Sequence, residues 1–82
     1  MEGIDERLLS QLSAQKEEVR KLVEEHQKLE RELQRYIAKR FITPQEEMEK
    51  KRIQKRKLRI KDELAQMVKE FQAELNQRRK GK

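Results

Sequence analysis

The chain of 82 residues contains no cysteine, so it forms no disulfide and offers no thiolate to a metal ion. No apolar run approaches the roughly 20 residues that a helix needs to cross a bilayer. Residues 1–6 have neither the basic nor the apolar region of a signal peptide. We therefore expect a cytoplasmic protein with no membrane span.

Hydrophobic residues are also scarce, at 33% of the chain against 46% charged residues, which excludes a large compact core. Such a composition can indicate disorder. Here, however, the apolar residues recur at helical spacing, which indicates long amphipathic helices. Pro44 is the only proline, and Gly3 and Gly81 are the only glycines, so few positions interrupt a helix. The sequence predicts a single all-α domain over residues 1–82.

The sequence before Pro44 predicts a turn. Thr43 suits an N-cap whose hydroxyl accepts from the backbone N–H of Glu46, while the Glu46 carboxylate reaches back to the Thr43 N–H and completes a capping box. Pro44 suits the first position of a helix and disfavours helical geometry at Thr43. We expect a first helix over about residues 5–39, a turn over 40–43, a second helix over 44–79 and a frayed basic tail over 80–82.

Each expected helix carries an apolar stripe, and the two stripes match. In the first helix the apolar residues alternate at spacings of three and four, as in a coiled coil. Folding back at the turn pairs residues whose numbers sum to about 83: Leu29–Ile53, Leu22–Ile60, Val19–Leu64, Leu12–Phe71 and Leu8–Leu75. This match at five levels predicts an antiparallel, coiled-coil-like two-helix hairpin. In this register Glu25 is expected to meet Arg56, and Glu18 to face Glu63.

Further apolar residues lie beside the seam between the two helices. We assign these residues to a self-association surface: Leu9, Val23, Ile37, Leu58, Val68 and Leu75. Two helices bury only the stripe between them, and small scaffolds without a disulfide or metal seldom hold together on that alone. We therefore predict a homo-oligomer in which two hairpins pack into a four-helix bundle. Another helical protein is the alternative partner.

The only histidine, His26, lies within the apolar stripe of the first helix. A metal site would need further ligands on the same face, and the carboxylate of Glu30 at i+4 is a weak partner by itself. We favour a structural histidine that is hydrogen-bonded across the helix pair. The sequence predicts no metal and no cofactor.

The motifs of common enzymes are also missing. The sequence has no Gly-rich phosphate loop, no nucleophile elbow and no zinc-ligand spacing. A two-helix hairpin lacks the concavity that buries a substrate. We expect no catalytic residues, no small-molecule substrate and no enzymatic activity.

The expected second helix carries the whole charge excess. Residues up to Thr43 hold nine Lys/Arg and nine Asp/Glu, whereas those from Pro44 on hold thirteen and seven, which gives the net charge of +6. Five cations form one outward basic stripe: Lys51, Arg52, Lys55, Arg56 and Arg59. Such a stripe can bind the phosphates of nucleic acid without reading their sequence. Charge runs on helices are more often solvated faces, and the absence of Trp argues against both base stacking and membrane-surface binding.

Three segments over about residues 19–68 carry a family resemblance. They are Glu25-His26 followed by Leu29 and Leu33, then Thr43 to Glu47, then Lys57 to Leu64. In this order they resemble the YdcH-like group of small bacterial proteins, whose members share an "EH..L" segment, a "T..EE" turn and a "KL.LKDE" segment. The chain departs from that pattern at Tyr36-Ile37, where the group tends to "LE", and in a longer tail after Val68. The resemblance implies a short helical hairpin from a bacterial cytoplasm and implies no activity.

The sequence thus leads to two hypotheses on function. The first is a non-enzymatic helical hairpin that acts by helix–helix association, with itself or with another helical protein. The alternative is nonspecific nucleic-acid binding through the basic stripe. The two differ in salt dependence, because phosphate contacts weaken steeply with salt whereas apolar packing does not.

Overall fold

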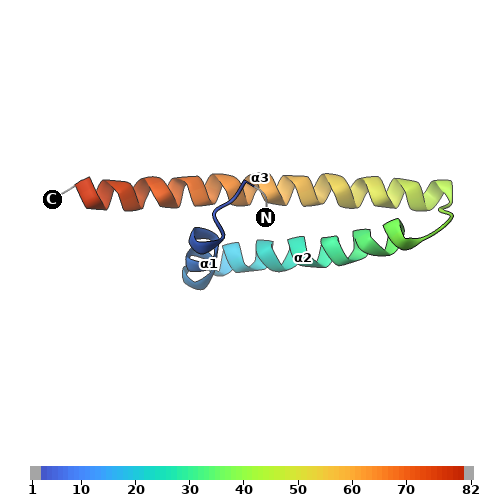
Figure 1. The fold of residues 1–82 in the computed structure, drawn as a ribbon, viewed down its shortest axis with the longest axis horizontal. Helices are drawn as coiled ribbons and strands as arrows, with labels where there is room; N and C mark the ends of the chain where they lie inside the picture. The colour runs from blue at the N-terminus through green and yellow to red at the C-terminus, as the bar shows by residue number, and fades with distance from the viewer. Residues whose placement is uncertain (1–2, 81–82) are drawn as a thin grey trace.

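The computed structural model describes residues 3–80, with the side chains of residues 3–78. Three helices follow one another along the chain: α1 (Glu6–Gln15), α2 (Glu17–Ala38) and α3 (Pro44–Lys80). No strand occurs in the described part of the chain, so the all-α prediction is confirmed. The molecule is elongated, 60 × 17 × 17 Å, because α3 runs along its whole length while α2 and α1 cover part of it (Figure 1).

The turn before α3 forms as the sequence predicted. The Glu46 N–H donates to the Thr43 hydroxyl at 3.1 Å, and the Thr43 N–H donates to the Glu46 carboxylate at 3.2 Å, which is the capping box. Lys39 adds an ion pair with Glu46. The connection spans residues 39–43, one residue more than expected, and α3 begins at Pro44. α3 continues through Lys80, and residues 81–82 of the expected tail lie outside the described residues.

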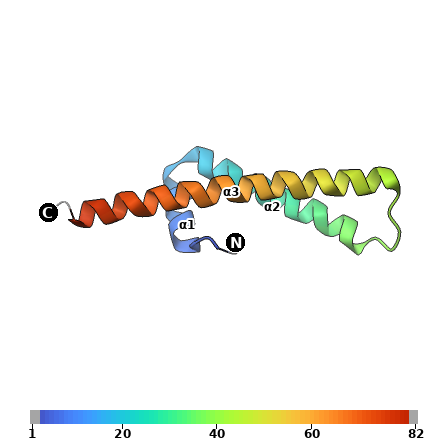
Figure 2. The ribbon, with the colours of Figure 1, turned by 90° about the horizontal axis from the view of Figure 1, so that it is seen from above.

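The prediction of one helix over residues 5–39 is wrong, and with it the two-helix hairpin. The helix is interrupted at Lys16, whose backbone is extended at φ −122° and ψ 119°. Asp5 caps α1 by accepting from the N–H groups of Arg7 and Leu8 at 3.0 and 3.3 Å. After the break, α2 runs antiparallel to α3, whereas α1 lies across α3 (Figure 2).

Burial explains the break at Lys16, because no glycine or proline requires it. By lying across α3, α1 buries Leu9 and Leu12, and the residues before α1 bring Ile4 into the same cluster. Burying each of these side chains is worth roughly 1.5–3 kcal/mol. Helix propensity differs by less than about 1 kcal/mol per residue, so tertiary packing overrides the local preference for a continuous helix.

The core lies where all three helices meet. Val19 of α2 and Ile60 and Leu64 of α3 are completely buried at its centre. The whole cluster consists of Ile4, Leu9, Leu12, Val19, Ile60, Leu64, Val68 and Phe71. Farther towards the turn, Figure 2 shows α2 ending to one side of α3, and burial decreases accordingly. Leu33 is still buried there, but Ile37 at the last turn of α2 is 55% exposed.

Candidate functional site

The basic stripe lies on the outer side of α3, as predicted. All five of its members are exposed: Lys51, Arg52, Lys55, Arg56 and Arg59. Four of them, all except Lys51, line a shallow open hollow of about 440 Å³. The arrangement follows from helical geometry, because side chains three and four residues apart lie on one side of a helix.

Two of these cations are already neutralised within the chain. Arg56 donates two hydrogen bonds to Glu25 on α2, at 2.7 and 3.2 Å, and Arg52 lies 3.7 Å from Glu49 one turn earlier. The hydrogen bond from Arg56 lowers the pKa of Glu25, and the same contact raises the pKa of Arg56.

The other three members of the stripe, Lys51, Lys55 and Arg59, make no ion pair with any residue that the structure describes. They are the members free to bind an external anion. The basic stripe is therefore neutralised in part, at Arg52 and Arg56, and is an unpaired cationic surface at its other three members.

His26 belongs to α2 and is only 9% exposed. It lines a cleft of about 360 Å³ together with Leu9, Ser10, Val23 and others from α1 and α2. Burial, and secondarily Lys57, lowers the pKa of the ring. The described residues contain no group of three His, Cys, Asp or Glu that would hold a metal ion. The expected hydrogen bond across the helix pair is not found between His26 and the described residues, so this part of the prediction is wrong.

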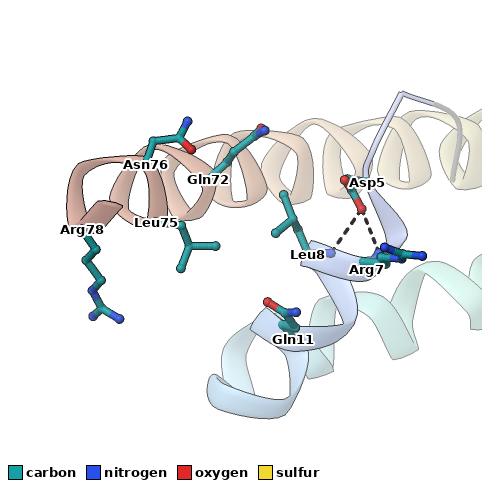
Figure 3. Close-up of a pocket in the computed structure, with 8 residues that line it drawn as sticks. All are labelled: Asp5, Arg7, Leu8, Gln11, Gln72, Leu75, Asn76 and Arg78. Atoms are coloured by element: carbon teal, nitrogen blue, oxygen red, sulfur yellow. Dashed lines mark hydrogen bonds between the residues drawn. The ribbon is translucent and has the colours of Figure 1, made fainter. Parts of the chain in front are cut away.

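A second cleft, of about 710 Å³, lies between the start of α1 and the last turns of α3. Leu8 and Leu75, a predicted pair, are directed into the space between the two helices (Figure 3). The one carboxylate that lines the cleft, Asp5, is engaged in capping α1. Paired carboxylates for acid–base chemistry are thus missing from this cleft.

The apolar residues assigned to self-association divide into three groups. Leu9 and Val68 are buried within the chain, which corrects their assignment. The reason is the break at Lys16, which turns α1 onto the face of α3 that contains Val68. Val23 and Leu75 are half-buried and pack against the core. Ile37 and Leu58 remain 55% and 59% exposed.

The structure adds two exposed apolar residues that the sequence analysis did not assign to this surface. Phe41 in the connection is 86% exposed, and Met48 in the first turns of α3 is 63% exposed. Ile37 of α2 lies just before the connection, so all three are close to the turn along the chain, and we call these three residues the turn patch. Phe41 was missed because a residue outside a helix has no helical register. Its only sequence signal is an aromatic residue in a connection that is otherwise polar or basic apart from Ile42.

Comparison with known proteins leaves the chain without an assigned relative: no family model, no curated protein and no solved structure matches it. Among the residues described, no helix is both long and apolar enough to cross a bilayer.

Proposed function

We propose that this chain is a non-enzymatic helical protein that acts by helix–helix association, in the first place with a second copy of itself. The observation that carries the proposal is the turn patch, because Ile37, Phe41 and Met48 are more than half exposed near one end of the molecule. Single exposed apolar residues are ordinary, but a group of large ones indicates an interaction surface.

Energetics support the same proposal. A small domain without a disulfide or metal gains little beyond what its chain entropy costs. Covering a large apolar side chain fully contributes roughly 1.5–3 kcal/mol, so a second copy that covers the turn patch and Leu58 adds substantially to stability. Four helices, α2 and α3 from each copy, then surround the shared surface. The resemblance to the YdcH-like group adds a bacterial cytoplasmic setting to the proposal.

Sedimentation equilibrium at tens of micromolar tests the association. We expect a dimer whose melting temperature rises with protein concentration. A variant with Ile37→Gln, Phe41→Ser and Met48→Gln should dissociate at these concentrations, whereas the control Ala14→Gln, at an exposed position on α1, should not. A sharply melting monomer with concentration-independent stability would overturn the proposal.

The unpaired cations of the basic stripe favour nonspecific nucleic-acid binding as a second candidate function. Lys51, Lys55 and Arg59 are exposed and unpaired among the described residues. Fluorescence anisotropy with a labelled duplex over a salt series tests this candidate. Changing all three residues to Gln should weaken binding and flatten its salt slope, whereas changing Lys21, Lys28 and Arg35 on α2 to Gln should have less effect. No binding by the parent at low salt would exclude the candidate.

A further inference from the structure

One flank of α3 carries charges that are sorted by sign along the helix. Steps of three and four residues connect its side chains, so they form one continuous row, which we call the charged stripe. Its members, all exposed, are in order Arg52, Lys55, Arg56, Arg59, Glu63, Gln66, Glu70 and Glu74. Glu49, one turn before Arg52, pairs with it and precedes the row. From Arg52 on, the first four members are cations, and every charged member after them is an anion. The sign changes between Arg59 and Glu63.

Neither half of the charged stripe is fully neutralised within the chain. In the basic half, Lys55 and Arg59 make no ion pair with the described residues. In the acidic half the same is true of Glu63 and Glu74, while Glu70 accepts a hydrogen bond from the neutral amide of Gln66 at 3.2 Å. The row therefore presents a positive segment and a negative segment of similar length to the solvent.

We propose that the charged stripe pairs α3 with α3 of a second copy in antiparallel orientation. A two-fold axis at position 61, midway between Arg59 and Glu63, sets Arg59 opposite Glu63 and Arg52 opposite Glu70 of the second copy. Symmetry repeats both contacts on the other side of the axis. Parallel pairing would instead set like charges opposite each other, so the sorting of charge selects the antiparallel form.

This inference rests on the proposed self-association and specifies its orientation. Exposed ion pairs contribute little affinity, but they determine which orientation and register are tolerated. In the register given above, the last turns of α3, which extend beyond α1 (Figure 1), come level with Met48 of the second copy. The charged stripe thus brings a helix of the second copy to Met48 of the turn patch, and covering apolar surface there adds to the affinity.

Charge exchange between two variants tests the orientation. The basic-half variant carries Arg52→Glu, Lys55→Glu and Arg59→Glu, and the acidic-half variant carries Glu63→Lys, Glu70→Lys and Glu74→Lys. Arg56 is kept because it holds Glu25. Lys and Glu are both good helix formers, so the helix is maintained, which circular dichroism verifies. Sedimentation equilibrium is run on the parent, on each variant alone and on an equimolar mixture of the two variants.

We expect the dissociation constant of each variant alone to rise at least about tenfold over that of the parent. The mixture should recover a one-to-one heterodimer. Apart from Arg56, which is paired with Glu25, one copy then carries only negative charge on the stripe and the other only positive. The control variant, Lys21→Glu, Lys28→Glu and Arg35→Glu, reverses three exposed cations on the outer side of α2. It changes the net charge as much as the basic-half variant does, yet should dimerise like the parent.

The outcomes separate this inference from the proposed function. A parent that dimerises while both variants also dimerise alone overturns the antiparallel pairing and leaves association through the turn patch in place. A monomeric parent overturns both. If a reversed variant fails to fold, the neutral set Arg52→Gln, Lys55→Gln and Arg59→Gln replaces it, and unchanged dimerisation of that set counts against the pairing. The parent is run with and without nuclease treatment, and association that disappears on treatment also refutes the inference.

Discussion

Arg56 of α3 donates two hydrogen bonds to the carboxylate of Glu25 on α2, from Nε at 2.7 Å and from Nη2 at 3.2 Å. The planar guanidinium matches a carboxylate in this bidentate geometry, so the contact constrains the orientation of the two side chains as well as the distance between them. It confirms the antiparallel alignment of α2 with α3 and the pairing of these two residues that the sequence predicted. Both residues are partly exposed, so the contact specifies register more than it stabilises the fold.

The capping box predicts a measurable cost at Thr43. Thr43→Ala removes the acceptor for the Glu46 N–H and should lower the free energy of unfolding by about 1 kcal/mol, the usual effect of a lost N-cap. Thr43→Ser keeps the oxygen and should be nearly neutral. Urea denaturation measures both. Equal stability of the Ala variant and the parent would show that the cap contributes nothing to stability.

The core predicts a sharp contrast between two leucines of α3. Leu64 is completely buried, so Leu64→Ala should lower the free energy of unfolding by about 2–5 kcal/mol, enough to unfold much of so small a protein. Leu58 is 59% exposed, so Leu58→Ala should change the free energy of unfolding by less than about 0.5 kcal/mol at concentrations too low for association. Similar losses from the two changes would contradict the described packing of α3.

The break at Lys16 predicts that proline is tolerated at one position of the N-terminal segment. Glu17 is the first residue of α2, where proline fits, and Lys16 before it is already extended. Glu17→Pro should therefore change the free energy of unfolding by less than about 1 kcal/mol. The control Glu24→Pro lies inside α2 and should cost about 3 kcal/mol or more. Equal losses would mean that about residues 5–39 form one continuous helix, as the periodicity had predicted.

His26 predicts a pH dependence of stability. Burial lowers its pKa in the folded state below the ordinary value of 6.5, so the unfolded chain binds a proton more readily. Stability should fall as the pH drops from about 6.5 towards the lower pKa of the folded state. Lys57 and Lys61 oppose protonation and Glu30 favours it, without reversing the sign.

The comparison that isolates this effect is urea denaturation of the parent and of His26→Gln between pH 7 and 5. The difference in free energy of unfolding between the two proteins should depend on pH in this interval. The lowered pKa values of Glu25, Glu30 and Glu46 act below their ordinary value of 4.5 and so outside it. Parallel pH profiles of the two proteins would contradict the assignment to His26.

Local signals explain which parts of the fold the sequence could predict. Thr43, Pro44 and Glu46 lie within four residues of the chain. Thr43 and Glu46 hydrogen-bond to each other and Pro44 favours the start of a helix, so the turn can be predicted from the sequence alone. The register of α2 on α3 follows from matching apolar spacings, as Glu25 and Arg56 confirm. The break at Lys16 has no such signal, because the residues around it are good helix formers and only the burial of α1 on α3 favours the bend.

The surfaces also divide into features that local sequence patterns predict and features that depend on tertiary packing. The exposure of the basic stripe follows from helical periodicity, and the structure agrees at all five positions. The charge of Arg56 in this stripe is neutralised by Glu25 of α2. The matched apolar spacings of the two helices predicted this pairing correctly. Leu9 and Val68 were assigned to the wrong surface because a straight first helix would have left them beside the seam. The exposure of Met48 is consistent with helical register, because Met48 lies well away from the buried Ile53 around α3. Phe41 lies outside any helix, so no register predicts its exposure.

The extended residue at Lys16 also separates the helical hydrogen bonding of α1 from that of α2. The helical hydrogen-bond ladder of α1 ends where the Lys16 N–H donates to Leu12, and that of α2 begins where the Lys16 carbonyl accepts from Arg20. No helical bond spans the joint, so α1 can detach and re-dock without unwinding α2. The contacts of α1 with α3 join residues more than 40 positions apart in the chain. Forming these contacts requires the closure of a long loop, which is slower than packing α2 against α3 progressively from the turn. We therefore expect α1 to be the last element to dock during folding and the first whose amide protons exchange with solvent.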